Sequence, residues 1–418
     1  MVIGGGLAGV ATAYELSRRG HETVLIERLR DVGLETSYAN GALLTPSMAE
    51  PWNAPGVHRL LVDSLINPHS AMKLRISAIP SLISWGARFL AHSTPVRHDA
   101  ATKASFLLAK YSVDRTRDVR VQLGLTYDAK AGGALKIFRT NSAVESTLAA
   151  ASKLMPLGLR LDILGADEAV AMEPTLADIR GQIAAALRFP DDEVGDARQF
   201  CVELAKSFVR AGGDLLASVH VTALSMERGR VSGVVVGGNA MRADSVVVAA
   251  GNSSAALLRP VGISVPIRPV KGYTLTFEAS HLKQRPLVPI IDDGLHAAIV
   301  PLGSRLRVAG TAEFAGNDRR LAPERVENLH ALLKRILPTV ARQLPCSSAE
   351  PWAGLRPMSA DGLPFIGPTH VGGLYINTGH GHLGWTHSMG SARLLADIMD
   401  GKKPDIDPNP YSAARYNT

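Results

Sequence analysis

The sequence predicts an α/β protein in which a doubly wound, Rossmann-type unit is combined with a second, α+β domain. The chain has 418 residues, more than one hydrophobic core usually organises. A glycine-rich motif stands between a short apolar run and a helical segment at the N-terminus, and several strand-like runs lie outside that unit. The composition, 46% hydrophobic and 20% charged, is that of an ordinary globular protein and does not indicate disorder.

The Rossmann-type unit is predicted by the start of the chain. Residues 4–9 read GGGLAG and satisfy G-x-G-x-x-G, a helix is expected over residues 7–19, and the strand TVLIE follows. Glycine permits the tight turn and lets backbone approach a diphosphate, and the helix N-terminus presents unpaired amides to the phosphates. Glu27 closes the second strand, where a carboxylate can accept hydrogen bonds from a ribose hydroxyl and would repel a 2′-phosphate. The unit predicts dinucleotide binding and disfavours NADP.

The glycine motif does not separate FAD from NAD, but two later segments favour FAD. A buried strand ends in Ala249-Ala250-Gly251, where small residues bring backbone close to a ligand. Near the C-terminus, NTGHGHLGW gives way to a helix expected from about Thr386. Reduced flavin carries negative charge on its pyrimidine side, so a helix N-terminus and backbone amides there would stabilise it. The alternative is a glycine-rich loop that caps an ordinary terminal helix, because threonine is a good N-cap residue.

Charge and cysteine usage argue against several function classes. The net charge of +7 comes from basic residues scattered in pairs, without a basic patch interleaved with aromatics, so nucleic-acid binding is not indicated. Cys201 and Cys346 lie far apart and form no CxxC motif. This pattern favours neither a disulfide framework nor a zinc site, and we expect no bound metal.

The chain is expected to be cytoplasmic. Met1 to Ile3 run straight into glycines without a signal peptide, and no run of about 18 apolar residues could span a bilayer. Residues 74–91 are apolar with flanking arginines. They could lie as an amphipathic helix on the inner face of the cell membrane, or form a buried core helix, which is the more common case.

At these motifs the sequence resembles the D-amino acid oxidase (DAO) superfamily of FAD-dependent oxidoreductases, and within it the bacterial D-amino acid dehydrogenase small-subunit type. The resemblance runs nearly end to end. It is carried in order by GGGLAG, ETSYANGALLTP, EPWNAPGV, ALRFPDDEVGD, VKGYTL, WAGLRPMSADGLPFIG and NTGHGHLGW.

The resemblance implies two domains that are discontinuous in sequence. A doubly wound FAD-binding domain is expected to take residues 1–124, 196–261 and 351–418. A substrate-binding domain with a mixed, mostly antiparallel sheet is expected to take residues 125–195 and 262–350. Strand-like runs such as LKIF, AALRF, YTLTF and RLRVAG agree with this division.

The expected FAD-binding residues come from the glycine motif, the ETSYANG segment and the C-terminal glycine loop. Short hydroxyls and amides in ETSYANG are expected along the phosphates and ribityl chain, and Val221 is expected beside the adenine. The full set is Ile3, Gly4, Gly5, Gly6, Leu7, Ala8, Gly9, Glu27, Arg28, Thr36, Ser37, Asn40, Gly41, Leu43, Val221, Ala250, Gly251, Gly381, Leu383, Gly384, Trp385 and Thr386.

Five residues are candidates for the chemistry. Arg356 is expected to clamp a carboxylate, because a guanidinium offers two parallel donors. Tyr273 could bind the substrate or pack in a core, and Glu313 could orient an amine or be a solvated loop acid. His380 and His382 are expected at the flavin edge, where either could deprotonate an incoming ammonium.

Two departures from the wider superfamily refine the expectation. The tyrosine that helps to hold the carboxylate in glycine oxidases is replaced here by Ala298, which favours the dehydrogenase type. Relatives with covalent flavin use a cysteine just beyond the clamp, where this chain has Met358 and Ser359. FAD is therefore expected to be non-covalent.

The implied activity is oxidative deamination of a small D-amino acid by hydride transfer from the α-carbon to FAD, giving a 2-oxo acid and ammonia. Electrons would pass to a quinone or another acceptor. D-proline or cis-4-hydroxy-D-proline dehydrogenation is an alternative, because a cyclic amine would place the same carboxylate on Arg356. Further alternatives are the flavin subunit of a multi-chain electron-transfer complex, with partner subunits or an oligomer, and a flavin-dependent tRNA-modifying enzyme, which the lack of a basic aromatic stripe disfavours.

Overall fold

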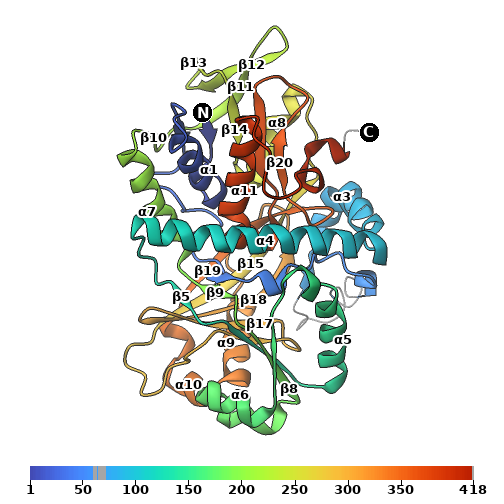
Figure 1. Cartoon of the computed structure of the whole chain (residues 1–418). Coiled ribbons are helices and arrows are strands. Elements are labelled where there is room, and N and C mark those ends of the chain that lie inside the picture. Colours follow the sequence, from blue (N-terminus) through green and yellow to red (C-terminus); the bar gives the residue numbers. More distant parts are fainter. Residues whose placement is uncertain (60–63, 65–71, 417–418) are drawn as a thin grey trace.

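The computed structural model describes residues 1–59, 64 and 72–416. Within them, two large β-sheets occupy opposite halves of the molecule (Figure 1). The long helix α4 (Pro95–Leu123) crosses the middle of the molecule between these halves. The chain passes between the halves several times, so segments that are far apart in sequence lie side by side.

The first half is built on a Rossmann-type sheet, which confirms the predicted doubly wound fold. Among the described residues, strands pair in the order β10-β2-β1-β14-β21-β20, parallel except for the antiparallel edge strand β20. The strands are β1 (Val2–Ile3), β2 (Val24–Ile26), β10 (Asp214–Leu216), β14 (Val246–Val248), β20 (Phe365–Pro368) and β21 (Leu374–Thr378).

Alternate residues of these short strands face two different layers, as the two-residue period of a strand requires. Val2 and Leu25 join a core formed with three helices, whereas Ile3 and Ile26 pack toward an antiparallel meander and a short helix. The helices are α1 (Leu7–Ser17), α7 (Ala197–Arg210) and α11 (Gly384–Met399). The second layer contains β11 (Val221–Glu227), β12 (Arg230–Val236), β13 (Asn239–Arg242) and α8 (Ser254–Leu258).

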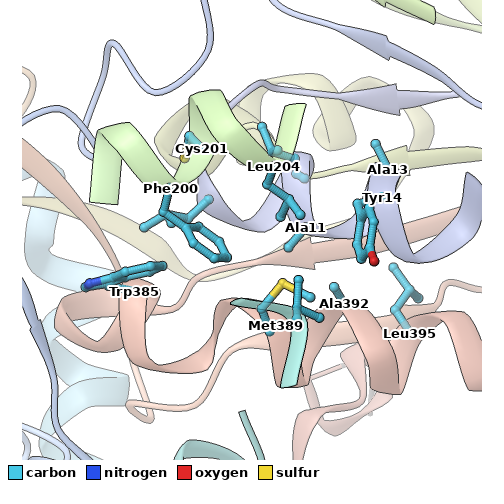
Figure 2. Packing of buried hydrophobic residues seen from close by; sticks show 14 of the residues in the cluster. Ala11, Ala13, Tyr14, Phe200, Cys201, Leu204, Trp385, Met389, Ala392 and Leu395 are labelled. Carbon is cyan, nitrogen blue, oxygen red and sulfur yellow. The ribbon is translucent and has the colours of Figure 1, made fainter. Parts of the chain in front are cut away.

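The helical layer is held together by a dense apolar core (Figure 2). Figure 2 shows Tyr14 of α1, Phe200 and Leu204 of α7, and Met389 of α11 gathered between the three helices, and all four are buried. Burying one side chain of this size contributes about 1.5–3 kcal/mol. The packing therefore fixes the start of α1 relative to the start of α11.

The second half is built on the predicted mixed, mostly antiparallel sheet. In the described part of the chain its order is β19-β15-β18-β17-β16-β6-β8-β7, with β4 pairing beside β18; only the β16–β6 and β18–β4 pairs are parallel. The strands are β4 (Met72–Leu74), β6 (Ala134–Phe138), β7 (Asp162–Leu164), β8 (Ala185–Phe189), β15 (Ile267–Glu278), β16 (Ile290–Asp292), β17 (Ala297–Leu302), β18 (Arg305–Phe314) and β19 (Glu350–Ser359).

Helices and a small sheet complete this half. Helix α9 packs Leu329 and Leu333 against Leu275 and Phe277 of β15 in a second core. The helices are α3 (Ile79–Ala91), α5 (Asn141–Ser152), α6 (Ala166–Met172), α9 (Pro323–Ile336) and α10 (Pro338–Gln343). The small sheet contains β3 (Leu43–Leu44), β5 (Lys130–Ala131) and β9 (Glu193–Val194).

The division into cofactor and substrate domains at the expected boundaries stays a prediction. The strands β4 and β19 both pair within the nine-stranded sheet, although they come from segments expected in the cofactor domain. The C-terminal segment thus contributes to both sheets. This matters for the site, because β19 carries Arg356.

Glu15 of α1 is a buried charge on which three helices converge. Its side chain is fully buried, and its oxygens lie 2.8 Å from Arg18 Nε and 3.2 Å from Arg115 Nη2 of α4. Arg19 and Arg393 of α11 lie within 4 Å of the same carboxylate. One carboxylate therefore neutralises several cations at the junction of α1, α4 and α11.

We expect Glu15→Ala to lower the free energy of unfolding by about 3 kcal/mol, because Arg18 and Arg115 lose a fully buried carboxylate, whereas Arg19 and Arg393 keep Asp397 as a partner. Urea denaturation followed by circular dichroism measures the change. The control is Glu203→Ala, which removes the partly exposed pair with Lys206 and should cost less than about 1 kcal/mol. Equal effects of the two substitutions would contradict this account.

Candidate active site

A cavity of about 1550 Å³ lies between the two sheets. It is bordered by the carboxyl ends of β1 and β14 on one side and by β15, β18 and β19 on the other. In open α/β sheets, ligands bind outside the carboxyl ends of the parallel strands. The position of the cavity is therefore the one that the Rossmann-type half predicts for a dinucleotide.

The GGGLAG loop forms one end of this cavity. Gly4 has φ +108°, and a Cβ on it would lie 2.7 Å from the carbonyl oxygen of Ala249. A Cβ on Gly9 would lie 1.7 Å from the carbonyl oxygen of Gly4. Gly6 is the N-cap of α1 and has no side chain to cap the helix. Ser37 Oγ accepts from the Leu7 amide at 3.2 Å, and the other amides of the first turn remain available to an anion.

Glu27 lies beside this loop, where its buried carboxylate accepts hydrogen bonds from two backbone amides. Its oxygens lie 2.6 Å from the Gly5 nitrogen and 2.8 Å from the Leu29 nitrogen. Glu27 and Val221 both line the cavity. The carboxylate therefore orders the glycine loop at the edge of the cavity.

Nearly all of the residues expected to hold FAD line the cavity. Gly5 and Gly9 do not line it. The Gly5 amide donates to Glu27, and Gly9 of α1 packs against the backbone of Gly4. The expected residues in the lining are Ile3, Gly4, Gly6, Leu7, Ala8, Glu27, Arg28, Thr36, Ser37, Asn40, Gly41, Leu43, Val221, Ala250, Gly251, Gly381, Leu383, Gly384, Trp385 and Thr386.

Helix α11 starts earlier than predicted. Its N-cap is Leu383, preceded by a short 3-10 turn over Gly381–Leu383, and no side chain caps it. The hydroxyl of Thr386, expected near the helix start, accepts a hydrogen bond from the Thr45 nitrogen 3.1 Å away. The expectation of Thr386 as N-cap is therefore wrong, and the amides at the start of α11 face the cavity uncapped.

Arg356 of β19 extends over Gly272 of the neighbouring strand β15. A Cβ on Gly272 would lie 2.3–2.5 Å from the carbon and nitrogens of the guanidinium, so only glycine leaves room for it. Nη1 is buried and has no hydrogen-bond partner among the described residues. Burial lowers the pKa of Arg356 to about 10, so the side chain remains charged at neutral pH. The cavity thus contains a cation with no protein counter-ion on that nitrogen.

An aromatic stack lies beside this arginine. The guanidinium carbon lies 5.5 Å from the centre of the Trp52 ring, and Trp52 stacks on His382 with ring centres 5.1 Å apart. His380 Nε2 lies 3.0 Å from the hydroxyl of Ser391. Trp52 and both histidines line the cavity.

The electrostatics of the two histidines do not fit a general base. Burial lowers the pKa of His380 to about 4. Burial, followed by the charge of Arg356, lowers the pKa of His382 to about 4. A group with this pKa is a weak base at neutral pH, and efficient bases titrate near the working pH. The possibility that one of them deprotonates an incoming ammonium is therefore not supported.

Tyr273 and Glu313 lie behind the sheet rather than in the cavity. The Tyr273 hydroxyl donates to Glu313 Oε2 at 2.6 Å, Arg75 binds the other oxygen, and Lys271 Nζ lies 3.7 Å away. Neither residue lines the cavity, whereas Gly272 does. Successive residues of a strand point to opposite faces, so the neighbour of Gly272 points away. The expectation that Tyr273 or Glu313 contacts the substrate is not supported by this geometry.

The sequence did not single out Asn252, which directly follows the small residues at the end of β14. Its Nδ2 donates to the carbonyl oxygen of Leu355 at 2.7 Å, and its buried Oδ1 has no partner among the described residues. It lines the cavity. The sequence could have indicated Asn252, because a polar residue directly follows the small residues Ala249-Ala250-Gly251 that were expected beside the ligand.

Two further findings bear on the predicted chemistry. Neither Cys201 nor Cys346 lines the cavity, which favours non-covalent FAD. No group of three or more histidine, cysteine, aspartate or glutamate side chains suited to a metal occurs in the described part of the chain. In the same residues, every helix is too short or too polar to cross a membrane.

Comparison with known proteins agrees with the geometry. The chain is 40% identical to a D-amino acid dehydrogenase of Methylobacterium nodulans and 36% identical to one of Bradyrhizobium diazoefficiens, over 100% of this chain and 98% of each relative. Among solved structures it resembles glycine oxidase from Geobacillus kaustophilus, with 24% identity, TM-score 0.75, and coverage of 99% and 98% of the two chains.

It also resembles L-proline dehydrogenase from P. horikoshii, with 18% identity, TM-score 0.79, and coverage of 100% of this chain and 96% of that one. These likenesses extend over both halves of the molecule. The model of the DAO family, described as FAD dependent oxidoreductase, matches residues 1–398. The chain therefore belongs to the DAO family of FAD-dependent oxidoreductases.

Proposed function

We propose that this protein is a dehydrogenase of small D-amino acids. It would convert a D-amino acid and water into a 2-oxo acid and ammonia while an acceptor, a quinone or another carrier, takes up two electrons. The observation that carries the proposal is Arg356, whose unpartnered guanidinium nitrogen faces the FAD cavity. The relatives at 36–40% identity support the choice of substrate class.

Arg356 would bind the substrate carboxylate through two parallel hydrogen bonds. Trp52 packs beside the guanidinium and limits its motion, so the substrate is held in one orientation inside the cavity. FAD, when bound, supplies the acceptor for the hydride that leaves the α-carbon. Water then hydrolyses the released imino acid to the 2-oxo acid and ammonia.

The protein's own contribution to FAD would come from backbone amides at the starts of two helices and from Glu27. The start of α1 would receive the diphosphate, and Glu27 would accept from the adenosine ribose. The start of α11 presents further amides to the same cavity, where they would stabilise negative charge. Each of these assignments rests on the geometry of the cavity lining.

A substrate panel tests the proposal directly. Purified, FAD-loaded protein is mixed with an artificial electron dye and with D-alanine, D-proline, cis-4-hydroxy-D-proline or L-alanine. We expect the greatest kcat/KM with D-alanine and none with L-alanine. Preference for a cyclic amine would instead support the alternative substrates, and activity that appears only with added partner proteins would support a multi-chain complex. Dye reduction by none of them would contradict the proposal.

We expect Arg356→Ala to raise KM about 100-fold or more, because the substrate carboxylate loses a bidentate, charge-assisted contact. Arg356→Lys should also raise KM, but by less, because an ammonium cannot form two parallel hydrogen bonds to the carboxylate. Both variants should retain the visible spectrum of bound flavin. Arg242→Ala, which removes an exposed arginine of β13, is the control and should behave as the unaltered chain. Loss of flavin from Arg356→Ala would show that the residue has been misplaced.

The pH dependence of kcat/KM tests the conclusion that His382 does not act as a general base. With a pKa of about 4, His382 is already neutral above pH 5. If kcat/KM falls as the pH is lowered from neutrality toward pH 5, the titration of His382 does not cause that fall. We expect His382→Asn to lower kcat/KM through lost packing on Trp52 while the apparent pKa of that fall stays the same. An apparent pKa displaced by more than about half a pH unit would instead make His382 the titrating base.

We also propose a peripheral membrane contact, through which a quinone could be reached. Helix α3 buries Leu82, Trp85 and Phe89, so residues 74–91 are neither wholly buried nor wholly exposed. Beside this buried face, the helix presents Ile83, 66% exposed, and Leu90, 44% exposed. Apolar residues on one face of a short helix are typical of helices that lie in a membrane interface.

We expect Ile83→Asp to abolish co-sedimentation of the protein with vesicles containing anionic lipid, because a charge on this face opposes burial in the headgroup region. The control is Val121→Asp on α4, where the valine is 80% exposed. An unaltered chain that does not sediment with vesicles, or equal loss in both variants, would refute the membrane contact and leave the dehydrogenase proposal untouched.

A further inference from the structure

Thr311 of β18 has a backbone conformation that threonine rarely adopts. Its φ is +59°, and it is the one β-branched residue with positive φ in the described part of the chain. A β-branched side chain in the left-handed region is a genuine outlier that costs on the order of 1–3 kcal/mol. Such strain persists only where surrounding structure enforces it, and it is concentrated at functional sites.

The strain arises at a β-bulge. Gly272 of β15 pairs with Ala312 and Tyr273 pairs with Gly310, so Thr311 is the extra residue on β18. A bulge leaves its extra residue out of the regular ladder and redirects its side chain. Here the redirected side chain reaches the cavity lining.

The hydroxyl of Thr311 has no partner within the protein. The residue is 6% exposed, and Oγ1 is buried without a hydrogen bond to any described residue. The two threonines of the adjacent strand are satisfied: Thr274 donates to the carbonyl of Ala39 at 2.8 Å, and Thr276 accepts from Arg307 at 3.1 Å. A buried, unpaired hydroxyl costs about 1–3 kcal/mol, and because Thr311 also lines the cavity, a bound ligand could satisfy its hydroxyl.

The bulge lies beside the carboxylate-binding arginine. The guanidinium of Arg356 occupies the space over Gly272, within 2.5 Å of the position that its Cβ would take. Gly272 is the cross-strand partner of Ala312, the residue next to Thr311. Paired residues have side-chain positions about 4.5–5.5 Å apart. The guanidinium and the hydroxyl thus border the same part of the cavity, and both have unpartnered polar atoms there.

We propose that Thr311 is a second anchor for the substrate carboxylate. Its Oγ1 would donate one hydrogen bond to a carboxylate oxygen whose other contacts come from Arg356. A carboxylate has about four acceptor positions, so a bidentate guanidinium leaves room for a further donor. This inference rests on the proposed function, because it assumes a substrate with a carboxylate in this cavity.

The test compares Thr311→Ser with Thr311→Ala, which differ only in the hydroxyl and share a side chain without β-branching. We expect Thr311→Ala to raise KM at least about tenfold, as for a lost hydrogen bond to a charged group, and Thr311→Ser to stay within about twofold. The same ratio is expected for the dissociation constant of propionate, an unreactive carboxylate, measured from the shift it causes in the flavin absorbance. An unchanged propionate affinity in Thr311→Ala overturns the proposal.

Two variants separate anchoring from a structural role. Thr311→Gly removes the hydroxyl and the strain together, so it should weaken propionate binding without lowering the unfolding temperature. Thr102→Val removes another buried hydroxyl without a partner, which lies on α4 outside the cavity lining, and should leave propionate affinity unchanged. If Thr311→Gly binds propionate as the unaltered chain does, the proposal fails.

Failure of this inference and failure of the proposed function give different results. If the chain does not oxidise any D-amino acid, the substrate panel fails with the unaltered sequence. If the chain is active but Thr311→Ala and Thr311→Ser have equal KM and equal propionate affinity, only the second anchor is refuted.

Discussion

The carbonyl oxygen of Leu355 is the point on which the geometry of the site depends. It accepts hydrogen bonds from Thr36 and Asn252, each at 2.7 Å, and both donors come from segments that line the cofactor cavity. Leu355 directly precedes Arg356 on β19, a strand of the other sheet. Each bond contributes about 1 kcal/mol net, but together they fix the arginine relative to the cofactor. A shift of the two sheets against each other would break both bonds and displace the guanidinium.

The arginine itself is placed at an energetic cost that a carboxylate ligand would offset. Because Gly272 has no side chain, the guanidinium can occupy the space above it on β15. Burial lowers the pKa of Arg356 to about 10, yet leaves it charged, and a buried charge without a partner is costly. An anion that enters the cavity removes this cost, while a neutral amine does not. The proposed selectivity for an acid substrate would therefore rest on desolvation as well as on hydrogen-bond geometry.

Local features of the site could be predicted from the sequence, and long-range ones could not. Gly4 and Gly9 were predictable because the turn and the close packing that require glycine are set within a few residues. The two alternatives for Tyr273 and for Glu313 could not be separated from the sequence, because the face of a strand on which a side chain lies changes with every residue. The bulge that turns Thr311 toward the cavity depends on the pairing of β15 with β18, which no single stretch of sequence encodes.

The strained bulge can persist because β18 is held from several sides. It pairs with β15 along one edge and with β17 along the other, so its backbone cannot relax without breaking both ladders. Behind it, a Cβ on Gly310 would lie 3.3 Å from Leu329 of α9, which shows how closely the helix covers this strand. The apolar core under α9 supplies stabilisation that exceeds the local strain of about 1–3 kcal/mol. The sheet that positions Arg356 thus also enforces the conformation of the neighbouring hydroxyl.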